Sequence, residues 1–129
     1  MPHMKFRGDL ELESIWRKPP AFRFSVPEED LHFKFTEAFL GGREQVLMLR
    51  FVVAEGRLTQ YVQIVLASGG EEWVLKLDRA YPILRTAGIK LLLATLGGWL
   101  EERGLVKTFS TIQAYEERGR FYSAHQSID

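Results

Sequence analysis

Cysteine and asparagine are both missing from this chain of 129 residues. Without cysteine, disulfides, thiolate catalysis, iron–sulfur clusters and cysteine-ligated zinc are all excluded. The loss of these two thermolabile residues is typical of thermophilic proteins, and the codon bias of a high-GC genome gives the same result. The composition is therefore compatible with a thermophile or with any organism of high GC content.

An excess of charge of either sign is also missing, because 17 lysines and arginines face 17 aspartates and glutamates. A non-specific binder of duplex nucleic acid needs many cations to neutralise phosphates, so the balance disfavours that class of protein. A local basic patch remains compatible with it. The first residues become charged early and contain no apolar segment of a signal peptide, so we expect a cytoplasmic protein.

Even the most apolar segment of the chain contains no long hydrophobic run. Its uncharged run extends only from Leu91 to Leu100, about half of the roughly 20 residues that cross a membrane. We therefore expect no membrane span. With 46% hydrophobic and 26% charged residues, the composition is that of a soluble globular protein. We predict a single domain over residues 1–129, with disordered ends over residues 1–4 and 120–129.

Hydrophobic and polar side chains alternate through most of the first 78 residues, which is typical of strands with one buried face. Short gaps that contain glycine separate the alternating segments and indicate hairpins. We predict an antiparallel meander of five or six strands over residues 4–78. The alternating segments are residues 6–16, 21–26, 31–39, 45–55, 57–68 and 71–77.

The hydrophobic period changes after Asp78 to three and four residues, which predicts a long helix over residues 79–103 with Asp78 as its N-cap. Ser110 and Gln113 have the spacing of a capping box, which predicts a short final helix over residues 110–118. The expected fold class is therefore α+β, with the long helix against the sheet.

The long helix is apolar nearly all round, and one face of a sheet can cover only part of this apolar surface. Its own C-terminal segment is one expected cover, and a second copy of the chain or another protein is the other. The adjacent Gly97 and Gly98 indicate a kink or a close contact. Candidate residues for a protein interface are Ala87, Leu93, Ala94, Leu96, Gly98 and Leu100.

Catalytic and metal-binding patterns are weak. Of three histidines, only His32 lies within a predicted element, and a general base needs a positioned partner. Asp9, Glu11 and Glu13 would share one strand face and converge on a cation, but the nearby Lys5 and Arg7 neutralise them. We therefore predict no catalytic residue, metal or cofactor. An enzyme that pairs a carboxylate with an arginine remains a third alternative.

Two functions remain in competition. The preferred hypothesis is a non-enzymatic binding or regulatory protein with a protein–protein surface, whose partner is its own copy, as in a homodimer, or a larger machine such as the transcription apparatus. The alternative is a binder of single-stranded DNA or RNA on the outer face of the sheet, where cations meet phosphates and an aromatic ring stacks on a base. The candidate nucleic-acid residues are Arg23, Lys34, Arg50, Tyr61 and Lys76.

Overall fold

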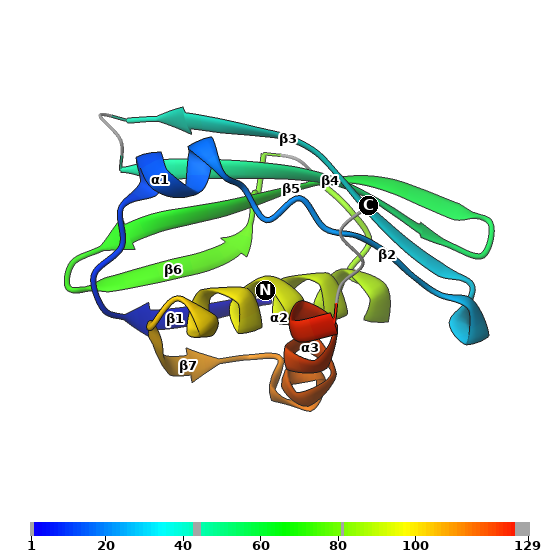
Figure 1. Ribbon diagram of the computed structural model, residues 1–129. Helices are drawn as coiled ribbons and strands as arrows, with labels where there is room; N and C mark the ends of the chain where they lie inside the picture. The colour runs from blue at the N-terminus through cyan, green and yellow to red at the C-terminus, as the bar shows by residue number, and fades with distance from the viewer. Residues whose placement is uncertain (1, 43–44, 81, 126–129) are drawn as a thin grey trace.

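A computed structural model describes residues 2–42, 45–80 and 82–125 of the chain (Figure 1). This part of the chain is α+β and contains one curled antiparallel sheet of seven strands and three α-helices. The predicted class is confirmed, but five or six strands was an underestimate. In chain order the elements are β1 (His3–Arg7), α1 (Leu12–Arg17), β2 (Arg23–Val26), the short 3-10 helix η1 (Pro27–Glu29), β3 (Leu31–Gly41), β4 (Val46–Glu55), β5 (Leu58–Gly69), β6 (Glu72–Leu77), α2 (Ala87–Glu102), β7 (Val106–Ser110) and α3 (Gln113–His125).

The strands β2 to β6 form the predicted meander, and the full order across the sheet is β2-β3-β4-β5-β6-β1-β7. Gly56 and Gly70 form two of the tight turns, at φ of 56° and 76°, in the left-handed region that glycine enters without steric cost. The first strand returns beside β6, and β7 pairs with its other edge. The strand β7 was not predicted, because only Ser110 of its five residues is buried and no alternation marks it.

The predicted first strand, residues 6–16, is wrong beyond Arg7. β1 ends there, and α1 forms from Leu12. The residues that α1 buries are Leu12 and Ile15, which are three positions apart, while Trp16 is exposed. A spacing of three fits a helix, and the even-numbered alternation of the sequence disguised it.

The long helix begins eight residues later than the expected start at residue 79. Thr86 is its N-cap and accepts a hydrogen bond from the amide of Ile89 at 3.3 Å. Asp78 instead accepts a bond from the amide of Ala80 in the preceding turn. Glu55 of β4 also contacts this helix start, because its carboxylate accepts bonds from the Thr86 hydroxyl and the Gly88 amide.

Secondary structure extends into both of the end segments, residues 1–4 and 120–129. β1 begins at His3, and α3 runs from Gln113 to His125 rather than from 110 to 118. Residues 120–125 are therefore helical, while residues 1 and 126–129 lie outside the described part. Among the described helices, none combines the length and the apolar character needed to span a bilayer.

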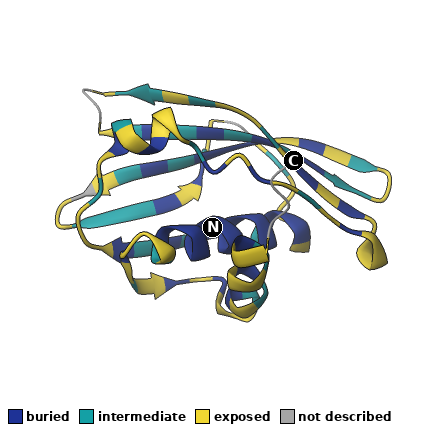
Figure 2. Ribbon diagram, in the orientation of Figure 1, coloured by how far each residue is buried: buried dark blue, intermediate teal, exposed yellow. Residues whose placement is uncertain are grey.

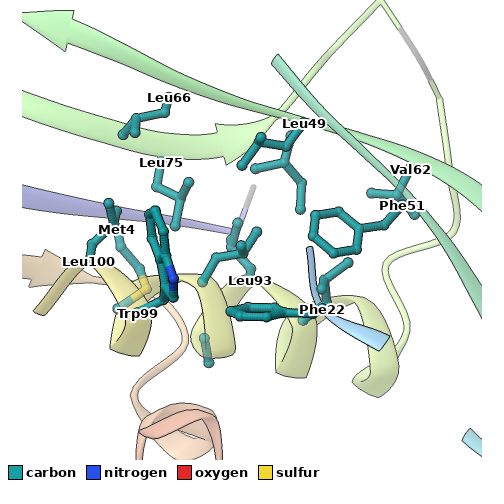
Figure 3. Packing of buried hydrophobic residues seen from close by; sticks show 14 of the residues in the cluster. Met4, Phe22, Leu49, Phe51, Val62, Leu66, Leu75, Leu93, Trp99 and Leu100 are labelled. Atoms are coloured by element: carbon teal, nitrogen blue, oxygen red, sulfur yellow. The ribbon is translucent and has the colours of Figure 1, made fainter. Parts of the chain in front are cut away.

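The core lies between the concave face of the sheet and α2. Every residue from Leu91 to Leu100 is buried, so the middle of α2 is dark blue in Figure 2. Figure 3 shows Met4, Leu93 and Trp99 together between α2 and the strands. The close contact predicted at Gly97 and Gly98 occurs on two sides of α2, toward β1 and toward α3. A Cβ at Gly97 would stand 2.6 Å from the Met4 sulfur, and a Cβ at Gly98 would stand 3.1 Å from the Arg120 Cα.

Candidate interaction surface

The helix residues predicted for a protein interface are covered by the same chain. Leu93, Ala94, Leu96, Gly98 and Leu100 are all buried, and of the six predicted residues only Ala87 is exposed. The cover on the side away from the sheet is α3, whose Gly119 approaches the backbone of Ala94. Of the two expected covers, the chain's own C-terminal segment is the one present, so these five side chains offer no surface to a partner.

α3 is held by contacts on several sides. Tyr122 stacks on Phe24 of β2 with ring centroids 5.1 Å apart. Glu116 is only 6% exposed and forms an ion pair with Lys107 of β7. One oxygen of Glu116 has no hydrogen-bond partner among the described atoms. These contacts fix α3 over α2, which leaves the convex face of the sheet as the larger uncovered surface (Figure 1).

The acidic residues considered for a cation do not gather. Glu13 lies on α1 and pairs with Arg17 at 2.8 Å. Asp9 and Glu11 line an open hollow of about 250 Å³ together with Lys18 and Arg103, whose charges oppose theirs. Within the described ranges, no three acidic or histidine side chains are grouped as a metal site would require.

Arg103 is held against the core by an aromatic ring. Its guanidinium carbon lies 3.3 Å from the centroid of the Trp99 ring. Burial lowers the pKa of Arg103, and the carboxylate of Glu102 opposes that shift. Arg103 also donates to the Trp99 carbonyl at 3.4 Å, so we attribute to it a role in closing the end of α2.

The outer face of the sheet is the convex face, opposite α2, and strand register aligns its side chains in rows. Lys34 lies opposite Arg23 on β2 and Val52 on β4, and Val52 lies opposite Tyr61 on β5. Directly opposed residues point to the same face. We call Arg23, Lys34, Val52 and Tyr61 the basic row. Its exposed members include Tyr61, at 64%.

A polar ladder runs beside the basic row and consists of Glu37, Arg50, Gln63 and Asp78. Arg50 donates to Glu37 at 2.9 Å and to Gln63 at 2.7 Å, and Gln63 donates in turn to Asp78. The Arg50 guanidinium also lies 4.8 Å from the Phe39 ring centroid. The carboxylate of Glu37 therefore neutralises Arg50, one of the cations predicted for nucleic-acid contact.

An apolar band occupies the next two rows. Met48 lies opposite Phe39 and Val65, and Ala67 lies opposite Val46 and Val74. Phe39 is 38% exposed, and the other five side chains are half-buried. Scattered exposed apolar residues are normal on a protein, but adjacent rows of them form a contiguous patch and mark a binding surface. The apolar band comprises Phe39, Val46, Met48, Val65, Ala67 and Val74.

Cations surround this band in excess. The outer face carries six basic residues and three acidic ones, although the whole chain is neutral. Folding produces this surplus, because the alternation of side chains along the strands places most carboxylates away from the outer face. The basic residues are Lys5, Arg7, Arg23, Lys34, Arg50 and Lys76, and the acidic ones are Glu37, Glu72 and Asp78.

All five residues predicted for nucleic-acid contact lie on this outer face, but not in one cluster. Arg23, Lys34 and Tyr61 share the basic row, whereas Arg50 belongs to the polar ladder. Lys76 lies opposite Val65, at the edge of the apolar band. Sequence reasoning missed the apolar band as a site. The mixed pattern of β4, where even positions are also apolar, was the signal for it.

Comparison of the chain with protein-family models, with curated protein sequences and with solved structures gave no match.

Proposed function

We propose that this chain is a non-enzymatic binding protein that holds another protein on the outer face of its sheet. The observation that carries the proposal is the apolar band, which lies in the middle of an uncovered sheet and is bordered by charged residues. Protein interfaces share this arrangement of an apolar centre and a polar rim. The band contains Phe39 and Met48, and Arg50 and Tyr61 lie in the two neighbouring rows; all four are residue types enriched in interfaces.

The charge of the rim favours a particular partner. A symmetric dimer through this face would bring the same patch of both subunits together. The cations of one rim would then meet those of the other, and like charges across an interface cost several kcal/mol. A protein with an apolar centre and carboxylates around it complements the face better. We therefore favour such an acidic partner over a second copy.

Paired bait variants test this proposal. Met48→Glu places a charge within the apolar band, and Phe121→Glu places the same charge on the exposed side of α3. Each bait is used to isolate proteins from cells of the source organism. We expect a protein that binds to the Phe121→Glu bait and does not bind to the Met48→Glu bait. High salt should dissociate it from the bait. Equal recovery by both variants contradicts it, as does a concentration-dependent dimer in light scattering that Met48→Glu abolishes.

Single-stranded nucleic acid is the second candidate, and the basic row favours it. Arg23 and Lys34 are exposed beside one another, and Tyr61 extends the same row with an accessible ring. Cations for phosphates next to an aromatic platform are the parts of a single-strand site.

Fluorescence anisotropy with a labelled oligothymidylate tests this candidate at low and high salt. Lys34→Glu should weaken binding, and Lys18→Glu on the opposite side of the chain should not. Lys34 is a better test than Arg50, because Arg50 is bound into the polar ladder. No binding even at low salt, where phosphate contacts are strongest, eliminates the candidate.

A further inference from the structure

A basic hollow opens at the side of the outer face where β6 and β1 pair. Its volume is about 350 Å³, and its described lining residues are His3, Lys5, Val74, Lys76 and Arg79. This volume falls within the range of small-molecule sites, roughly 300–1,000 Å³. Four of the five residues carry a basic group, and no carboxylate belongs to the described lining.

Lys5, Lys76 and Arg79 are the lysine and arginine cations of the basic hollow. Within the described part of the chain, no ion pair includes Lys5, Lys76 or Arg79. The adjacent Asp78 is engaged elsewhere, since it accepts bonds from Gln63 and from the amide of Ala80. Three clustered cations in a neutral chain create a local positive field, which attracts anions and raises their local concentration.

An exposed aromatic ring contacts two residues of this lining, although it is not itself part of the lining. Phe109 of β7 lies opposite Lys5, whose ammonium group is 5.9 Å from the ring centroid. The ring of His3 lies 5.2 Å from that of Phe109. Phe109 is nevertheless 47% exposed. Part of its ring therefore remains accessible to a planar group, for which aromatic side chains form a stacking platform.

The backbone beneath the hollow is fixed. The His3 amide donates to the Thr111 hydroxyl at 2.9 Å, and the Thr111 amide donates to the His3 carbonyl at 3.1 Å. Lys5 and Lys76 stand on paired strands, where His3 is opposite Lys76 and Lys5 is opposite Val74. Lys5 and Lys76 therefore extend from a paired sheet backbone, and Arg79 lies in the turn that follows β6.

We infer that the basic hollow binds a nucleoside phosphate, with the phosphate among Lys5, Lys76 and Arg79 and the base against Phe109. A free nucleotide and a nucleotide within a single strand share this chemistry. The inference does not depend on the proposed protein partner, because the binding of AMP alone tests it.

Amide-resolved NMR tests the site with three separate probes: AMP, adenosine and inorganic phosphate. AMP is expected to shift the amides of Lys5, Lys76, Arg79 and Phe109. It should bind about ten-fold more tightly than either half alone, a difference near 1.4 kcal/mol. Equal affinity for AMP and adenosine overturns the role of the cations. Equal affinity for AMP and phosphate overturns the contact with Phe109.

Three variants locate the binding. Lys76→Gln should weaken AMP and phosphate alike, and Phe109→Leu should weaken AMP only. Arg57→Gln removes an exposed cation from the β4–β5 turn and should change neither. The amide spectrum of each variant shows whether it is folded. Loss of binding in Arg57→Gln equal to that in Lys76→Gln overturns the site, and so does the absence of shifts at low salt.

An oligothymidylate without a terminal phosphate separates the two sources of the ligand. Shifts of amides at both the hollow and Tyr61 assign the ligand to a single strand of nucleic acid that crosses the outer face. Shifts with AMP and none with the oligonucleotide assign it to a free nucleotide. Both results support the hollow as the binding site.

Discussion

Gly119 of α3 and Ala94 of α2 meet backbone to backbone. A Cβ added at Gly119 would stand 2.5 Å from the carbonyl carbon of Ala94, closer than real Cβ atoms approach. This contact lets α3 cover the face of α2 that the sheet does not reach. The all-round apolar character of α2 is therefore explained within one chain, and the apolar band lies on the other side of the sheet.

Gly119→Ala should destabilise the protein, because the added methyl group forces α3 away from α2. Such overpacking costs roughly 1–3 kcal/mol. Chemical denaturation measures the loss. Gly41→Ala is the matched control, since a Cβ at Gly41 meets nothing within 4 Å. Equal stability of the two variants would show that α3 does not sit as described.

Lys107→Met should also destabilise the protein, because it leaves the buried carboxylate of Glu116 without its main partner. Loss of one partner of a buried pair costs several kcal/mol, and we expect roughly 2 kcal/mol for this partly exposed lysine. The double variant Lys107→Met/Glu116→Leu should recover most of the loss. Glu13→Gln is the control. It breaks only the exposed ion pair with Arg17, so it should leave the unfolding midpoint unchanged. A double variant no more stable than the single one contradicts this account.

Glu55→Ala should weaken the start of α2, since Glu55 accepts hydrogen bonds from the Thr86 hydroxyl and the Gly88 amide. Loss of a cap and of a carboxylate near a helix N-terminus costs about 1–2 kcal/mol. Hydrogen exchange should increase first at the amides of residues 88–91. The exposed turn residue Glu71, changed to Ala, serves as the control, and faster exchange in both variants would rule out a specific cap.

Tyr61→Ala should leave stability within about 0.5 kcal/mol of the parent chain, since the side chain is exposed and makes no buried contact. The same change should weaken binding on the outer face, whether the partner is a protein or a strand. Calorimetry of unfolding and a binding titration provide the two measurements. A large loss of stability would mean that Tyr61 is structural.

Much of the sheet follows from the sequence. β5 alternates Val62, Ile64 and Leu66 toward α2, so its single buried face could be predicted from period alone. The even positions of β4 are also apolar, so only the structure shows that its buried face is the one with Leu47, Leu49 and Phe51. The start of α2 could not be predicted in this way. Pro82 fits the first turn of a helix, but residues 82–86 cross β5 near its start instead. There Gln60 both donates to and accepts from the backbone of Leu84.

The candidate site was only partly predictable. Strand period places Lys34 and Tyr61 on the outer face, which the register confirms. Period does not show that Glu37 neutralises Arg50, because the bulge between Phe35 and Glu37 shifts the register. Nor does it show that Phe109 borders Lys5, since these residues are far apart in sequence and meet only when β7 joins β1.

Site-specific photo-crosslinking tests the central claim, that the outer face of the sheet is the binding surface. A photoreactive phenylalanine replaces Tyr61 in one chain and Phe121 in another, two aromatic residues of similar exposure, 64% and 57%, on opposite sides of the molecule. In cells of the source organism, the account predicts one defined adduct from position 61 and none from position 121. An adduct only from position 121, or the same adducts from both, would contradict it.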